Sequence, residues 1–151
     1  MLKFYNTPHR KIETFQPIDP QNVKIYTCGP TVYAEPHIGN WAAFIYWDIL
    51  VRVLRANGYN VERTMNITDV GHLVSDEDSG EDKLEKGARR EGKTAWEVAN
   101  FYTGKFKQGL KDLNLIVPDH LARATDFIQE QTNIINDLTI KGYTYETSDG
   151  I

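Results

Sequence analysis

The chain has 151 residues, 40% of them hydrophobic and 25% charged, which excludes a disordered or fibrous protein and suggests one domain with a sizeable core. Its 17 Lys and Arg residues against 21 Asp and Glu residues give a net charge of −4, which argues against a strongly basic nucleic-acid-binding module. The sequence has no apolar run near the ~20 residues of a membrane helix, no signal-peptide pattern and only one cysteine, Cys28, so we expect a cytoplasmic protein without an internal disulfide.

Residues 1–20 are polar and rich in turn-forming residues, and we interpret them as an N-terminal lead-in. A short hairpin is predicted within it, around Leu2–Phe4 and Ile12–Phe15. The next segment, Val23–Cys28, alternates between apolar and polar residues, which is typical of a strand. A Gly-Pro pair ends it.

A long helix is predicted over residues 37–57, which are apolar nearly all round. Its polar side chains Asp48, Arg52 and Arg55 form one narrow stripe. We therefore expect the helix to be buried over most of its circumference. Proline near its start and Gly58 just past its end fit the usual helix boundaries.

The segment Val61–Thr68 alternates again and predicts a second strand. A strand, a helix and a strand within residues 21–70 form a βαβ unit, whose strands are parallel and whose crossover is right-handed. The sequence therefore predicts the α/β fold class.

Residues 71–151 are predicted to be mainly helical, with a final strand. The predicted elements are an acidic loop at Gly71–Asp82, helices at Lys83–Arg90 and Thr94–Leu113, a helix or helix pair at Asp119–Lys141 stopped by Gly142, and a strand starting at Tyr143.

Spacings of three and four residues assign an inward face to two of these helices. The face of the first comprises Trp96, Ala99, Tyr102, Phe106, Leu110 and Leu113. The face of the second comprises Phe127, Ile128, Gln131, Ile135 and Leu138. We interpret the aromatic residues of the first face as core rather than as a platform for stacking bases.

Residues with chemical potential are densest from Cys28 to Asn40, where the sequence reads CGPTVYAEPHIGN. Ligands of open α/β sheets bind beyond the carboxyl ends of the strands, where Cys28 and Thr68 both lie. The predicted helix starts at the same crevice, and its free N–H groups and dipole favour a phosphate. His37 can stabilise a phosphate that gains charge, and Gly39 lets a flat group approach the helix backbone.

Two of these residues have ordinary structural interpretations as well. A histidine after a proline is often the first residue of a helix, with a local hydrogen bond. A free cysteine such as Cys28 is most often a small buried hydrophobe. The flanking residues favour the functional interpretation of both.

The stretches CGPTVY, PHIGN and NITDVGHL, in this order, resemble the N-terminal part of cysteinyl-tRNA synthetases, which are class I aminoacyl-tRNA synthetases. HIGN matches the HIGH signature of that family at three positions of four, and Ala122–Ile128 resembles its Arg-Ala-Thr helix start. The resemblance covers nearly the whole chain. It implies a Rossmann-like (HUP-type) parallel sheet half-domain with a helical insertion. The implied parts are the lead-in, a nucleotide-binding βαβ unit at 21–70, and a helical remainder with the start of the insertion at 71–151.

The resemblance also implies roles for the matching residues. Cys28 would be a zinc ligand, and zinc can select a thiol substrate because sulfur binds it directly. Gly29 and Thr68 would line the pocket for cysteine. The residues that would contact ATP, with His37 and Asn40 acting as catalytic residues on its phosphates, are Thr31, His37, Gly39 and Asn40. Asn40 replaces the usual histidine, and its amide carries no charge at any pH.

The implied activity of the parent protein is activation of L-cysteine by ATP, with Mg²⁺, followed by transfer to tRNA(Cys). The remaining zinc ligands, the KMSKS signature and the anticodon-binding domain of the family do not occur in this sequence. We therefore expect a truncated chain, the N-terminal portion of a catalytic domain. We also expect that it is inactive alone and that most tRNA contacts lie outside it.

Three other functions are also compatible with the sequence. A cysteine ligase that joins cysteine to an amino sugar resembles the synthetases through this region and lacks an anticodon domain. A different HxGH-type nucleotidyltransferase would not need Cys28. The third is a non-catalytic fragment that binds tRNA or another partner, although the acidic balance argues against tRNA.

Overall fold

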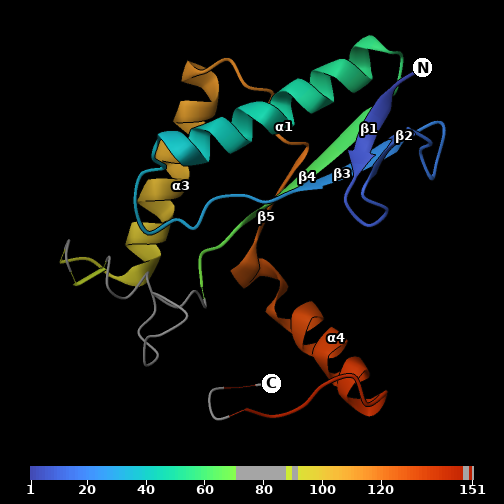
Figure 1. Ribbon diagram of the computed structural model, residues 1–151. Helices are drawn as coiled ribbons and strands as arrows, with labels where there is room; N and C mark the ends of the chain where they lie inside the picture. The colour runs from blue at the N-terminus through green and yellow to red at the C-terminus, as the bar shows by residue number, and fades with distance from the viewer. Residues whose placement is uncertain (71–87, 90–91, 148–149, 151) are drawn as a thin grey trace.

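A computed structural model of the chain describes residues 1–70, 88–89, 92–147 and 150 (Figure 1). The predicted acidic loop at Gly71–Asp82 and most of the predicted helix at Lys83–Arg90 lie outside these residues. The described elements are β1 (Lys3–Asn6), β2 (Lys11–Thr14), β3 (Val23–Thr27), α1 (Ile38–Ala56), β4 (Val61–Ile67), α3 (Ala95–Asp112), β5 (His120–Arg123), the 3-10 helix η1 (Ala124–Phe127) and α4 (Ile128–Ile140).

The predicted N-terminal hairpin is confirmed. Strands β1 and β2 pair antiparallel, with Lys3 opposite Thr14 and Asn6 opposite Lys11. Aromatic contacts attach the hairpin to the rest of the fold, because the ring of Phe15 lies edge-on to Phe4 at 5.4 Å and to Tyr59 at 5.5 Å. The lead-in therefore packs beside the end of α1 instead of hanging free.

Strands β3, β4 and β5 form a parallel sheet in that order, and α1 crosses between the first two. The predicted βαβ unit and parallel sheet are confirmed, and the architecture is that of a Rossmann-like α/β domain. The alternation in β4 is confirmed too, since Val61, Arg63, Met65 and Ile67 are all buried.

The third strand, β5, was not predicted, because we assigned a helix from Asp119 onward. Instead β5 pairs with β4, with Thr64 opposite His120. The Asp119 carboxylate accepts a hydrogen bond from the backbone N–H of Arg63 at 2.7 Å, which anchors the start of the strand. A strand of four residues is too short for periodicity to distinguish it from a helical turn.

Helix α1 occupies the predicted residues, but the expectation that it is buried nearly all round is wrong. Its buried residues are Phe44, Asp48, Val51 and Leu54. Exposed large side chains include Tyr46 at 69% and Ile49 at 49%. Asp48, assigned to the polar stripe, faces inward, where its carboxylate accepts hydrogen bonds from Ile116 N at 2.7 Å and from Arg52 Nε.

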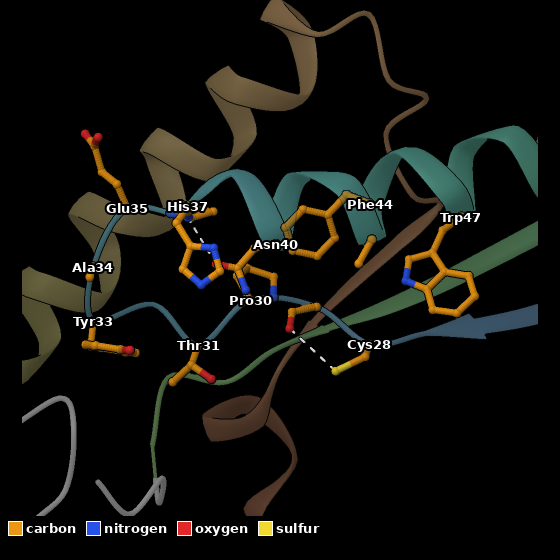
Figure 2. A pocket seen from close by; sticks show the side chains of 13 residues that line it. Cys28, Pro30, Thr31, Tyr33, Ala34, Glu35, His37, Asn40, Phe44 and Trp47 are labelled. Carbon is orange, nitrogen blue, oxygen red and sulfur yellow. Dashed lines mark hydrogen bonds between the residues drawn. The ribbon is translucent and has the colours of Figure 1, made fainter. Parts of the chain in front are cut away.

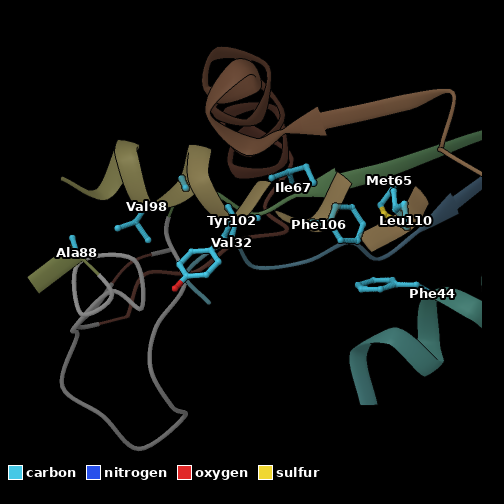
Figure 3. Packing of buried hydrophobic residues seen from close by; sticks show 10 residues of the cluster. Val32, Phe44, Met65, Ile67, Ala88, Val98, Tyr102, Phe106 and Leu110 are labelled. Atoms are coloured by element: carbon cyan, nitrogen blue, oxygen red, sulfur yellow. The ribbon is translucent and has the colours of Figure 1, made fainter. Parts of the chain in front are cut away.

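Helix α3 confirms most of its predicted inward face. It begins with a capping box in which Thr94 and Glu97 satisfy each other's backbone N–H groups, and the Thr94 hydrogen bonds lower the pKa of Glu97. Ala99, Tyr102, Phe106 and Leu110 are buried in the main apolar cluster (Figure 3). Trp96, at 61% exposed, and Leu113, at 45%, are wrong predictions, because Val98 takes the inward position in the first turn and Leu113 lies just past the last one.

Helix α4 lies away from the sheet in Figure 1, and none of its residues is buried. The inward face predicted for this helix is therefore wrong. The stop at Gly142 is confirmed by its φ of +74°, a backbone conformation that glycine adopts without strain. In place of a strand from Tyr143, the described residues show only an isolated bridge between Thr147 and Gly150. No described helix combines the length and the apolar character that a membrane span requires.

Removing the Asp48 carboxylate tests the buried face of α1. Asp48→Ala leaves the N–H of Ile116 without its partner and removes one of the two carboxylates, Asp48 and Asp119, that compensate the charge of Arg63, which is 1% exposed. We expect the free energy of unfolding to fall by about 3 kcal/mol, because the N–H of Ile116 loses its acceptor and a buried cation loses a compensating charge. Urea denaturation followed by circular dichroism measures it. Asp137→Ala, the same change at an exposed helical position, should stay within about 0.5 kcal/mol, and equal losses in both variants would contradict this account.

Candidate functional site

A pocket of about 360 Å³ lies between the carboxyl end of β3 and the N-terminus of α1 (Figure 2). Five residues predicted as a site line it: Cys28, Gly29, Thr31, His37 and Asn40. They come from the loop that leaves β3 and from the first turn of α1. The stretch predicted to form a site at the carboxyl edge of the sheet therefore lines a pocket.

The other two predicted residues lie beside the pocket rather than in its lining. Gly39 is next to His37 in the first turn of α1. Thr68 follows β4 and forms a parallel bridge with Thr31: its N–H donates to Pro30 O at 3.0 Å, and its carbonyl accepts from Val32 N at 3.1 Å. The ends of β3 and β4 are therefore held together where the pocket begins.

His37 is the N-cap of α1. Its Nδ1 accepts a hydrogen bond from Gly39 N at 3.0 Å, and the Asn40 Oδ1 accepts from His37 N at 3.0 Å, which completes a capping box. A backbone N–H can only donate, so Nδ1 carries no proton, and the proton of the neutral ring lies on Nε2. The structural interpretation of His37 is therefore confirmed, and it still leaves one ring N–H free to donate to a ligand.

Asn40 is fixed by the same cap. Its Oδ1 is occupied by the backbone of His37, so Nδ2 is the end that can donate to a ligand. Both side chains are exposed at the mouth of the pocket, and Figure 2 shows them side by side above Pro30. The first turn of α1 thus presents N–H donors from two neighbouring side chains.

Asn66 organises the base of the site and was not singled out from the sequence. Its Oδ1 accepts from Gly29 N at 2.8 Å and from Tyr26 OH at 2.9 Å, and its Nδ2 donates to Thr68 Oγ1 at 3.0 Å. One amide therefore connects the ends of both strands. The one indication in the sequence was a polar amide residue inside the predicted strand, two residues before Thr68.

Asp69 was also missed. It is 5% exposed, and its carboxylate accepts from Arg123 Nε at 2.9 Å, Thr125 N at 3.0 Å and Thr125 Oγ1 at 2.7 Å. These bonds attach the end of β4 to the turn that starts η1. The signal was present in two stretches quoted for the family resemblance, NITD and Arg-Ala-Thr, but nothing in the sequence says that they meet.

The buried interpretation of Cys28 is wrong, because the residue is exposed and its Sγ faces the pocket, with one long contact to Gly29 O at 3.7 Å. A thiolate there has the chemistry of a zinc ligand. Within the described part of the chain, however, no group of three or more Cys, His, Asp and Glu side chains could hold a metal ion. Cys28 is therefore not part of a ready-made metal cluster among these residues.

Replacing Gly29 tests the close approach of the two strand ends. A Cβ at this position would lie 1.7 Å from the carbonyl oxygen of Asn66, which is backbone and cannot turn away. We expect Gly29→Ala to lower the free energy of unfolding by about 3 kcal/mol or more, since overpacking forces the backbone apart. Gly104→Ala, where a Cβ meets nothing within 4 Å, is the control, and thermal denaturation of both variants decides.

Two substitutions of His37 distinguish its role as the N-cap of α1 from other contributions of its imidazole ring to stability. His37→Ala removes the N-cap acceptor and should cost about 1 kcal/mol of stability. His37→Asn keeps a good N-cap and should stay within about 0.5 kcal/mol of the original chain. Circular dichroism melting curves measure both, and an equal loss in the two variants would show that the cap is not what His37 contributes.

Residues 14–151 match the family model described as the tRNA synthetases class I (C) catalytic domain. Cysteine–tRNA ligase 1 of Burkholderia lata is 49% identical over 150 residues, covering 99% of this chain and 32% of the relative. The cysteine–tRNA ligase of Zymomonas mobilis is 45% identical over 148 residues, covering 98% and 29%. That of Treponema denticola is 46% identical over 144 residues, covering 95% and 29%. The chain therefore spans about three-tenths of the length of these curated relatives, and it belongs to the class I tRNA synthetase (C) catalytic domain family.

Proposed function

We propose that this chain forms part of the active site of a cysteine–tRNA ligase, which activates L-cysteine with ATP and Mg²⁺ in the cytoplasm and transfers it to tRNA(Cys). The observation that carries the proposal is the pocket itself. It brings the thiol of Cys28 from the end of β3 together with the N–H donors of His37 and Asn40 from the first turn of α1. The names of the relatives favour tRNA over an amino sugar as the acceptor of cysteine.

The charge distribution suits a triphosphate. Helix α1 has 19 residues and no acidic residue in its first turn, so its positive dipole end is not neutralised there. The one carboxylate among the described residues that line the pocket, Glu35, pairs with Lys105 at 3.4 Å. His37 Nε2–H, Asn40 Nδ2 and the Thr31 hydroxyl are therefore the donors proposed to meet the phosphates.

In the proposed first step, a carboxylate oxygen of cysteine attacks the α-phosphorus of ATP. The bond from that phosphorus to the β-phosphate oxygen breaks, and pyrophosphate leaves with the electron pair. Negative charge grows on the phosphoryl oxygens during this displacement, and fixed N–H donors such as those of His37 and Asn40 stabilise it. The tRNA terminal hydroxyl then attacks the carbonyl carbon of the adenylate, and AMP leaves.

Selection of cysteine is proposed to occur at the other end of the pocket. Gly29 and Thr68 would line the amino-acid site, and Cys28 would be one of several ligands of a zinc ion. Zinc bound there would discriminate cysteine from serine, because a thiolate binds zinc far better than a hydroxyl does. No group of three or more ligating side chains lies among the described residues, so the other ligands are proposed to lie elsewhere. We also propose that most tRNA contacts lie outside this chain.

Titration of the ¹⁵N-labelled chain with ATP and Mg²⁺ tests the nucleotide part of the proposal. We expect saturable shifts of the amide signals of Thr31, Gly39 and Asn40. His37→Asn, which keeps the cap, should weaken binding by about tenfold, since one lost charge-assisted hydrogen bond is worth that factor.

His9→Asn is the matched control, because His9 is an exposed histidine on the N-terminal hairpin loop. It should leave ATP binding unchanged. The proposal fails if the pocket amides do not shift, or if His37→Asn and His9→Asn bind ATP equally well.

A further inference from the structure

Helix α3 packs against the start of α1 through a contact between Gly109 of α3 and Trp41 of α1. Trp41 lies one turn after His37, and its indole ring occupies the space beside Gly109 of α3. A Cβ at Gly109 would lie 2.4 Å from both Cζ2 and Cη2 of that ring, closer than real Cβ contacts come. The two helices can therefore approach this closely only because residue 109 has no side chain.

The indole belongs to a cluster of three aromatic rings. It stacks on Phe106 at 5.8 Å with an interplanar angle of 19°, and it meets Phe44 edge-on at 5.5 Å. Phe44 and Phe106 contact each other at 5.1 Å and are both buried (Figure 3). A group added at Gly109 must therefore displace the indole from this stacking or separate the helices.

The same cluster is continuous with the pocket. Trp41 N donates to His37 O at 3.1 Å, so the ring and the cap belong to one helical turn. Phe44 lines the pocket directly. The ion pair of Lys105 with Glu35 is a second link between α3 and the segment before His37, but both side chains are half exposed or more, and such a pair contributes little.

We propose that Trp41 and Gly109 are positioning residues for the His37–Asn40 turn. Their contact fixes the distance between α1 and α3 and thereby fixes where the donors of His37 and Asn40 lie relative to Thr31. This inference rests on the proposed function for its consequence in nucleotide binding, but the positional effect itself can be measured without nucleotide.

The test compares Gly109→Ala with Gly104→Ala, the same substitution on the same helix where a Cβ meets nothing within 4 Å. Two quantities are measured: the ¹⁵N signals of the His37 ring and the Asn40 side chain without nucleotide, and the affinity for ATP and Mg²⁺. Gly109→Ala should move both sets of signals and weaken ATP binding by about tenfold, whereas Gly104→Ala should change neither and should raise the melting temperature through better helix propensity.

A second substitution that removes the steric clash distinguishes a positioning role of Gly109 from a general loss of folding in Gly109→Ala. A phenylalanine ring lacks the Cζ2 and Cη2 atoms that the new methyl group meets, so Trp41→Phe makes room for it. The double variant Trp41→Phe with Gly109→Ala should match Trp41→Phe alone in signals and affinity, even if Gly109→Ala alone does not fold.

The inference is overturned if Gly109→Ala and Gly104→Ala behave alike, or if Gly109→Ala impairs the Trp41→Phe variant as much as it impairs the unmodified chain. If the unmodified chain does not bind ATP, the proposed function fails instead. The His37 and Asn40 signals of the variants still decide the positioning role in that case.

Discussion

The parallel register of β3 and β4 is the constraint on which the site depends. Val23 lies opposite Val61 and Thr27 opposite Met65, so both strands run toward the same edge. The chain leaves β3 at Cys28 and leaves β4 at Thr68, and the bridge from Thr31 to Thr68 continues the pairing past the ends of both strands. Helix α1 must return from that edge to start β4, which places its N-terminus and His37 over the same ends. This register therefore brings the thiol of Cys28 and the N–H donors of His37 and Asn40 to the same pocket.

The βαβ unit also contains a buried charged side chain, the guanidinium of Arg63. Arg63 lies in the middle of β4, is 1% exposed, and donates through Nε to Thr27 Oγ1 at 3.2 Å. Its Nη1 and Nη2 have no hydrogen-bond partner within the described part of the chain. Burial lowers the pKa of Arg63, and the carboxylates of Asp48 and Asp119 oppose that change. Asp48 comes from α1 and Asp119 precedes β5, so the charge connects the helix to all three strands. Such a group favours one arrangement of these elements, because any other leaves the cation less compensated.

Local sequence patterns predicted the parts of the fold that are long and strictly periodic. The alternation in Val23–Cys28 and in Val61–Thr68, and the boundaries of α1 and α3, survive in the structure. Sequence patterns gave wrong predictions where the burial of a residue depends on contacts with another part of the chain. Periodicity shows that residues of α4 share a face, but it does not show whether anything covers that face. It likewise assigned Asp48 to solvent, although the backbone of Ile116 gives this carboxylate a partner inside.

The candidate site shows the same division. Cys28, Thr31, His37 and Asn40 could be proposed because they lie in one short stretch of sequence beside recognisable structural boundaries. Asn66, Asp69 and the pair of Trp41 and Gly109 could not, since their roles arise from contacts between residues far apart in the chain. Residues that carry chemistry are thus visible locally, whereas residues that hold them in place become visible only in the folded chain.

The central claim is that one pocket receives the reacting groups of both substrates. A crystal structure of the chain with a non-hydrolysable sulfamoyl analogue of cysteinyl-adenylate tests it most directly. The account predicts the sulfamoyl oxygens within hydrogen-bond distance of His37 Nε2 and Asn40 Nδ2, and the thiol of the analogue directed toward Cys28. An analogue bound elsewhere, such as along the N-terminal hairpin, or one bound here with its thiol directed away from Cys28, would contradict it.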